Sequence, residues 1–133
     1  MSALAADRSL LEAPRHPAMR IAEIPGKGRG VIAGDPIAED DLLEVVPVLP
    51  FAQRPDGVTT SADDYCFYWD EPPFEEAVAF GMLSLMNHSP EANAIFVTDI
   101  PARVIRVYAA RAIAVGEEIT INYGIPLWFE YQP

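Results

Sequence analysis

The sequence predicts a small, mostly β domain. Short apolar stretches of strand length recur along the chain, and its 13 prolines and 8 glycines interrupt them. Only one segment has the character of a helix. The 133 residues have the length of one domain. A hydrophobic content of 50% is sufficient for a core and argues against a disordered acidic chain.

The first predicted strands flank a glycine-rich turn. Residues 19–24 (MRIAEI) alternate apolar and polar side chains, as a half-buried strand does. The turn GKGRG at 26–30 follows, and residues 31–33 resume an apolar run. Residues 42–51 (LLEVVPVLPF) are β-branched and apolar. Two prolines within this last stretch predict an edge strand or a bulge, because proline cannot donate to a strand ladder.

The second half of the chain predicts one helix among further strands. Residues 65–69 (YCFYW) are strand-like, and residues 75–86 (EEAVAFGMLSLM) have helical character. Residues 94–97 and 104–109 are predicted to pair through a turn, and a last strand is predicted over 119–122.

The chain divides into an arm and one domain. Residues 1–18 are mixed in polarity and predict a loose or weakly helical arm. Residues 19–133 predict a single domain that includes a short aromatic C-terminal tail. The first residues lack a basic stretch followed by an apolar one, the pattern of a secretory signal. We therefore expect a cytoplasmic protein.

Charge and cysteine content exclude several classes of function. The formal net charge is −11, with 20 acidic and 9 basic side chains. Such a surface repels phosphate, so we expect no nucleic-acid partner, and it suits a basic protein partner. No apolar run approaches the ~18 residues of a membrane span. One cysteine, Cys66, and two histidines predict neither an intrachain disulfide nor a metal site.

The turn GKGRG is the first candidate for a binding role. Closely spaced glycines expose backbone N–H groups and can take positive φ angles, so such a turn can wrap a cofactor. It matches neither a P-loop nor a dinucleotide-binding fingerprint. Taken alone, the motif favours a tight turn between two strands.

A polar segment, Asn87-His88-Ser89, directly follows a buried apolar stretch. Polar groups placed there must find partners. The Asn87 side chain offers two donor hydrogens and one acceptor oxygen, so it can recognise an amide, an adenine edge or a carboxylate. Taken alone, His88 is more often a structural residue than a catalytic one.

The segment GEEITINYG at 116–124 combines a turn, two adjacent acids, a strand and a tyrosine. Neighbouring residues of a strand point to opposite faces, so Glu117 and Glu118 do not form an obvious catalytic pair. We expect structural or capping roles for both.

Four aromatic side chains cluster at Tyr65, Phe67, Tyr68 and Trp69. Core packing is the simplest interpretation. The alternative is an aromatic box for a cation, because Tyr65 and Phe67 share one face of a strand.

The order of three segments points to a family. GKGRGVIA, then SLMNHSPEANA, then ARAIAVGEEITINYG resembles the SET domain of protein-lysine methyltransferases, over about residues 20–129. The chain looks most like the minimal SET proteins of viruses and bacteria. The resemblance implies small curved β-sheets, with the C-terminal strand threaded beneath the NHS loop as a pseudoknot.

The resemblance also implies an activity and a cofactor. The chain would transfer a methyl group from S-adenosylmethionine to a lysine amine of a protein. The implied cofactor-binding residues are Lys27, Gly28, Arg29, Asn87, His88, Tyr123 and Trp128.

Two tyrosines, Tyr123 and Tyr65, are the implied catalytic residues. The implied substrate channel is lined by Tyr65, Phe67, Tyr123 and Phe129. A free lysine has a pKa of ~10.4, so its deprotonation near pH 8 costs about 3 kcal/mol. A dry channel beside a sulfonium lowers that pKa, so alignment rather than a strong base is required.

The chain departs from larger family members because it has no cysteine-rich zinc segment. We expect its aromatic tail to act as the lid, with Trp128 or Phe129 near the adenine or the channel mouth. The implied substrate is a Lys/Arg-rich protein or peptide, and a homodimer is compatible with the resemblance. The alternative function is a catalytically idle SET-like module that binds a basic protein or peptide.

Overall fold

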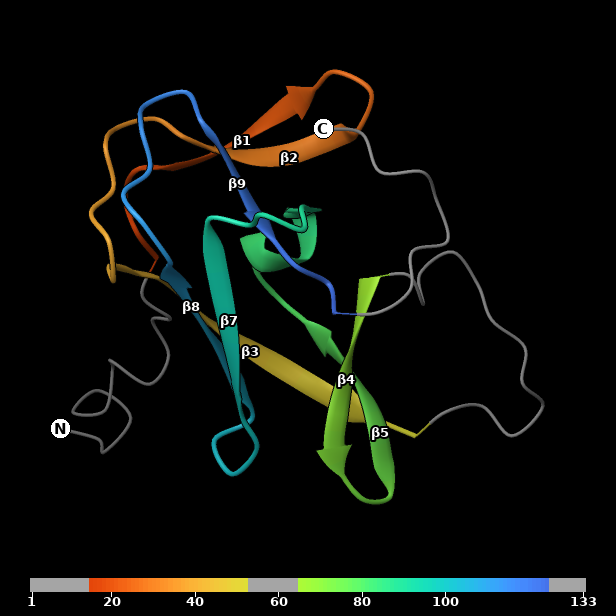
Figure 1. Cartoon of the computed structure of the whole chain (residues 1–133). Coiled ribbons are helices and arrows are strands. Elements are labelled where there is room, and N and C mark those ends of the chain that lie inside the picture. Colours follow the sequence, from red (N-terminus) through yellow and green to blue (C-terminus); the bar gives the residue numbers. More distant parts are fainter. Residues whose placement is uncertain (1–14, 53–64, 125–133) are drawn as a thin grey trace, which may run out of the picture.

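The structure is a computed structural model that describes residues 15–52 and 65–124. These residues form nine strands and one 3₁₀ helix (Figure 1). The elements are β1 Met19–Ile24, β2 Gly28–Ala33, β3 Leu42–Phe51, β4 Cys66–Glu71, β5 Phe74–Ala79, η3 Met82–Leu85, β6 Asn87–His88, β7 Ala94–Asp99, β8 Val104–Ala109 and β9 Glu118–Ile121.

The strands form two sheets. One has the order β1-β2-β9-β6, and the other has the order β4-β5-β3-β8-β7. Figure 1 shows the β1–β2 hairpin at one end of the molecule and the β4–β5 hairpin at the opposite end. Both sheets contribute to one core, in which Val31, Leu43, Trp69, Ile105 and Ile119 are fully buried. The predicted mostly β fold of small curved sheets is confirmed.

The last strand, β9, is inserted between two earlier ones. It pairs antiparallel with β2, where Val31 lies opposite Ile119. It pairs parallel with β6, where Asn87 lies opposite Thr120. The backbone N–H of Ser89 continues this pairing and donates to Ile121 at 2.9 Å. This insertion is the expected pseudoknot, and it brings the ends of distant segments together.

Most predicted strands are confirmed, with small shifts at their ends. β1 has the predicted bounds, and β2 begins within the glycine-rich segment at Gly28. The strands predicted to pair over residues 94–97 and 104–109 form the antiparallel β7–β8 hairpin. The last strand begins one residue earlier than predicted, at Glu118, and ends at Ile121.

The helix predicted over residues 75–86 is wrong. Its first part is the strand β5, which pairs with both β3 and β4. The buried side chains Ala77 and Ala79 alternate with more exposed ones along β5, the period of a strand. Only η3 is helical, and no helix in the described ranges has the length and apolar character to cross a bilayer.

The strand β3 was predicted to lie at an edge, yet it lies in the middle of its sheet. Its first half, up to Pro47, pairs with β8, and its second half, which contains Pro50, pairs with β5. Each half is therefore paired on one side only. For this reason a strand in the middle of the sheet tolerates two prolines, which cannot donate a ladder hydrogen bond. The expected bulge is present between Leu42 and Glu44.

The last four residues of the predicted arm pack against β3. The backbone N–H of His16 donates to β3 at 2.7 Å, and the Arg15 guanidinium pairs with Glu44. The His16 ring lies 3.1 Å from the Asp41 carboxylate and accepts the N–H of Ala18. Residues 1–14 lie outside the described ranges.

Glu44 is a buried carboxylate that the sequence analysis did not single out. Its side chain sits on the inner side of β3 with a residue exposure of 2%. Its two oxygens accept the N–H groups of Met82 and Leu83, each at 3.1 Å. A Cβ on Gly81 would lie 2.8 Å from this carboxylate, so the glycine allows it to cap η3. Glu44 therefore fixes the element that leads into β6.

We predict that Glu44→Gln destabilises the fold by about 2 kcal/mol, because hydrogen bonds to a charged group contribute about 1.5–3 kcal/mol. Glu75→Gln is the matched control, since Glu75 is exposed on β5. Its effect should stay within about 0.5 kcal/mol. Urea unfolding of both variants measures the difference, and equal stabilities would contradict the role of Glu44.

Candidate functional site

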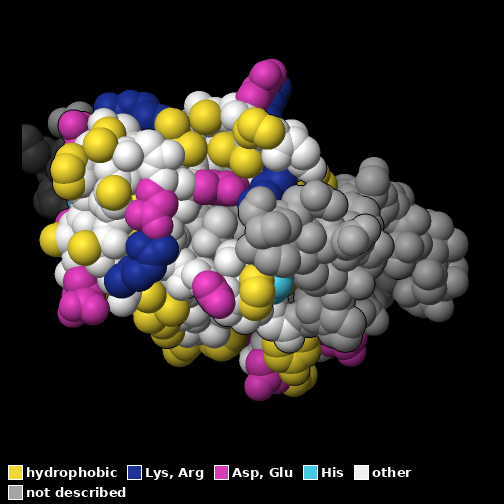
Figure 2. All heavy atoms as spheres, turned by 45° about the horizontal axis from the view of Figure 1, so that its top comes forward, with side chains coloured by type: hydrophobic (Ala, Val, Ile, Leu, Met, Phe, Trp, Pro, Cys, Tyr) yellow, Lys and Arg dark blue, Asp and Glu magenta, His cyan; other side chains and the backbone are white. Residues whose placement is uncertain are grey.

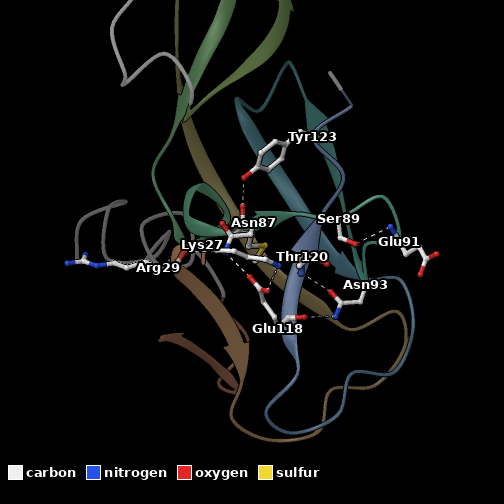
Figure 3. A network of polar contacts seen from close by, with 10 residues as sticks. Lys27, Arg29, Asn87, Ser89, Glu91, Asn93, Glu118, Thr120 and Tyr123 are labelled. Atoms are coloured by element: carbon white, nitrogen blue, oxygen red, sulfur yellow. Dashed lines mark hydrogen bonds and ion pairs between the residues drawn. The ribbon is translucent and has the colours of Figure 1, made fainter. Parts of the chain in front are cut away.

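The three sequence motifs meet at the side chain of Glu118 on β9 (Figure 3). One carboxylate oxygen lies 3.0 Å from the Lys27 ammonium. The other accepts the Asn87 side-chain amide at 2.8 Å. The same amide nitrogen also donates to the carbonyl of Arg29 at 3.2 Å. The glycine turn, the NHS segment and the C-terminal segment are thus tied by one carboxylate.

The glycine turn closes the β1–β2 hairpin. Gly26 and Gly28 have φ angles of 76° and 78°, a conformation that favours glycine. The backbone N–H of Lys27 donates to Ile24 at 3.0 Å. The tight turn favoured from the motif alone is therefore confirmed. A hollow of about 390 Å³ opens beside it, lined by Glu23, Ile24, Pro25, Gly28 and Arg29.

Gly30 has a different role from the two turn glycines. A Cβ there would lie 2.6 Å from Ile24, 2.7 Å from the Asn87 amide and 2.9 Å from the Glu118 carboxylate. These distances are shorter than real Cβ contacts allow. The lack of a side chain at position 30 is what lets the polar network lie against β2.

Asn93 fixes the backbone on which Glu118 stands. Its side-chain amide donates to the carbonyl of Glu118 at 2.8 Å, and its side-chain oxygen accepts the N–H of Thr120 at 2.9 Å. The residue is 2% exposed. The Asn93 side chain therefore substitutes for a neighbouring strand along this part of β9.

His88 links β6 to the residues that follow β9. Its Nδ1 accepts the backbone N–H of Tyr123 at 3.0 Å, so the proton of the neutral ring is on Nε2. The two rings lie 5.1 Å apart between centroids. Burial lowers the pKa of His88. The ring is therefore a neutral structural link rather than a proton donor.

Tyr123 points its hydroxyl toward the backbone beside Asn87 (Figure 3). The hydroxyl donates to the carbonyl of Met86 at 3.0 Å. Burial raises the pKa of Tyr123 above its ordinary value of 10, and negative charge on Tyr65 and Glu118 raises it further. Tyr123 is therefore a neutral phenol at physiological pH.

The aromatic cluster of β4 is divided between core and surface. Trp69 is fully buried, and the Phe67 ring meets the Phe96 ring edge-on at 5.5 Å. Tyr65 and Tyr68 are instead 61% and 76% exposed. Core packing, the simplest interpretation from sequence, is thus confirmed for two of the four side chains and wrong for the two tyrosines.

A comparison with known families decides the identity of this arrangement. The SET domain model matches residues 28–124, from the glycine turn to just beyond Tyr123. The chain belongs to the SET-domain family.

Two relatives agree with this assignment. A Schizosaccharomyces pombe protein named "Histone-lysine N-methyltransferase, H3 lysine-37 specific" is 34% identical over 115 residues, covering 84% of this chain and 77% of the relative. A solved structure from Plasmodium falciparum, described as a candidate histone methyltransferase, aligns with a TM-score of 0.68. It is 24% identical and covers 86% of this chain and 99% of that chain, a likeness that shows the fold. The chain is a protein-lysine N-methyltransferase.

The SET domain brings most of the residues predicted for the cofactor into one place. Lys27, Asn87 and Tyr123 lie around the same network. The Arg29 side chain extends away from it, and only the Arg29 carbonyl takes part (Figure 3). Trp128, another predicted cofactor residue, lies outside the described residues.

The predicted substrate channel is described only in part. Tyr65 directly precedes β4, and Tyr123 follows β9. Phe67 packs against β7. The channel roles of Tyr65, Phe67 and Tyr123 stay predictions, and Phe129 lies outside the described ranges.

Two residues of this network, Glu118 and Asn93, have roles that the sequence did not indicate. Glu117 does cap a turn as expected, because it accepts the N–H of Ala114 and pairs with Arg111. Glu118 faces the other way and connects all three motifs. The alternation of side chains along a strand indicated that the two acids point to opposite faces. It did not indicate which partners each carboxylate has. Asn93 gave one weak signal, a polar side chain between alanines before a strand.

We predict that His88 makes the stability of this SET domain fall in mild acid. Burial lowers the folded pKa, so the stabilisation is present above the unfolded pKa of about 6.5 and is lost as the pH falls from there through the folded value. His88→Asn keeps an oxygen that can accept the Tyr123 N–H but does not titrate.

The measurement is the free energy of unfolding at pH 7.5 and pH 5.5 in both proteins. The wild type should lose more stability between these values than His88→Asn does. His16 is present in both proteins, so its contribution to the change in unfolding free energy cancels in the comparison. The same loss in both would contradict a buried neutral His88.

Proposed function

We propose that this SET domain transfers the methyl group of S-adenosylmethionine to a lysine amine in a basic protein of the histone type. The observation that carries the proposal is the meeting of the glycine turn, Asn87, His88 and Tyr123 on either side of β9. Such a site can hold a cofactor on one side and present a tyrosine hydroxyl on the other.

The residues present suit a cofactor with an amino-acid end and a sulfonium. Both protons of the Asn87 amide are engaged, one by Glu118 and one by Arg29. Its oxygen Oδ1 is then the atom available to accept from a cofactor ammonium. A Cβ at Gly28 would meet open space, so the turn backbone is accessible to a ligand. When bound, S-adenosylmethionine supplies a methyl group that a neutral amine can take directly.

The chain's own residues align and desolvate the target amine. The Tyr123 hydroxyl donates to Met86, so its oxygen keeps lone pairs for an amine N–H or weak C–H contacts. Because the pKa of Tyr123 is raised, the phenol does not act as the base. The exposed ring of Tyr65 can flank the lysine stem and its ammonium before the proton leaves to water.

Charge supports a basic substrate. The net charge of −11 produces a field that attracts Lys/Arg-rich segments. Figure 2 shows acidic side chains distributed across the face it presents, with basic ones among them. The relative at 34% identity is named for histone H3. Histone H3 is therefore the first substrate to test.

We predict that Tyr123→Phe lowers the rate of methyl transfer by about tenfold to a hundredfold, because misaligned reactants lose effects of that size. Cofactor affinity should change little, since the backbone contact with His88 remains. Tyr68→Phe is the matched control, as Tyr68 is an exposed tyrosine on β4.

Transfer of a labelled methyl group from S-adenosylmethionine to histone H3 measures the rates. A thermal shift with the cofactor measures binding, and at about 100 times Kd a ligand adds roughly 2.7 kcal/mol of stability. Absence of both stabilisation and labelling in the wild type would contradict the proposed function.

We further predict that the KM for a basic peptide substrate rises with salt. The Debye length falls from about 10 Å at 0.1 M to about 3 Å at 1 M, so added salt screens the acidic field. The KM for the cofactor, measured over the same salt series, is the control. A peptide KM that does not respond to salt would leave the acidic charge without a role in substrate attraction.

A further inference from the structure

We propose that Glu118 is the positioning residue of the cofactor site. It fixes the orientation of the Asn87 amide and neutralises the Lys27 ammonium, and so prepares the site for a cationic sulfonium. The inference rests on the proposed function, because it concerns the binding of S-adenosylmethionine.

The Asn87 amide has two possible orientations related by a flip of its nitrogen and oxygen. Glu118 offers only acceptor oxygens, and so does the Arg29 carbonyl. With distances of 2.8 Å and 3.2 Å to these two groups, the nitrogen must face them. The Oδ1 atom is thereby directed away from both. Without the Glu118 carboxylate, one of the two constraints on the amide is lost.

Lys27 is the only lysine in the chain, and its charge lies next to this amide. The side chains of Lys27 and Glu118 are 13% and 17% exposed, so water screens the pair weakly. Removal of the carboxylate takes away the negative charge that lies 3.0 Å from this poorly exposed ammonium. The Lys27 ammonium would then repel the positively charged sulfonium of S-adenosylmethionine more than the neutral thioether of the demethylated product.

Glu118 is held firmly enough to direct its neighbours. The Asn93 side chain donates to the carbonyl of Glu118 and accepts the N–H of Thr120, the two backbone groups on either side of Ile119. The antiparallel partner of Glu118 on β2 is Ile32. The missing side chain of Gly30 leaves space for the carboxylate. These contacts place the carboxylate before any ligand binds.

A purely structural role for Glu118 makes a different prediction. Loss of a fold anchor would weaken S-adenosylmethionine and its demethylated product alike. Loss of a counter-charge weakens the sulfonium ligand more than the neutral one. The ratio of the two affinities therefore separates positioning from mere support of the fold.

The test is calorimetric titration of the full chain with S-adenosylmethionine and, separately, with the demethylated product. We expect Glu118→Gln to weaken the sulfonium ligand about tenfold or more, since a bond to a charged group is lost. The product should be affected several-fold less. At saturating cofactor, kcat should change far less than the cofactor KM.

Glu117→Gln is the matched control, because it removes the same charge from the adjacent residue, which lies just before β9 and pairs with Arg111. Affinities in Glu117→Gln should match the wild type. A second variant, Glu118→Gln with Lys27→Met, removes both charges and should restore the wild-type affinity ratio. Equal weakening of both ligands in Glu118→Gln, or no difference from Glu117→Gln, would overturn the inference.

A second measurement does not depend on the cofactor. The single lysine gives one side-chain ¹⁵N signal, and the Asn87 amide gives another. In the wild type we expect both to be protected from exchange with water, and in Glu118→Gln both should shift and lose protection. Unchanged signals would overturn the inference even if cofactor binds. Failure of the wild type to bind S-adenosylmethionine, with the signals behaving as expected, would instead remove the proposed function.

Discussion

The structure depends on the parallel alignment of two short segments, Asn87–His88 and Thr120–Ile121. Two residues of β6 are too few to hold a strand in place by themselves. The alignment is completed by Ser89, which continues the ladder, and by the Asn93 side chain, which bonds to the backbone of Glu118 and Thr120. Once β9 is fixed, Glu118 faces the glycine turn and Tyr123 lies beside His88.

Two acidic side chains serve as internal connectors in this acidic chain. Glu44 receives the first N–H groups of η3, and Glu118 receives an amide and an ammonium from two other elements. In both cases a glycine, Gly81 or Gly30, leaves the space that the carboxylate needs. A carboxylate in such a place is satisfied only when all its partners are present, so it favours one arrangement of the elements.

Local patterns predicted the mostly β class of fold, and the resemblance carried by three motifs predicted that Asn87, His88 and Tyr123 lie at one site. The alternation in residues 19–24 sets β1, and the order of the three motifs sets the family. The helix predicted over residues 75–86 failed because apolar residues in a short run fit either period until pairing partners are known. Asn93 and Glu118 could not be assigned for a related reason. Their roles depend on contacts 25 and 91 residues away in the chain.

The insertion of β9 also governs the order in which the molecule can be built. The β1–β2, β4–β5 and β7–β8 hairpins use neighbours close in sequence and can form early. The pairing of β9 with β2 and β6 closes much longer loops, so its entropy cost is met late. Because Glu118 and Tyr123 arrive with that strand, the site is assembled only as folding is completed. A nascent or partly folded chain therefore has hairpins but no active centre.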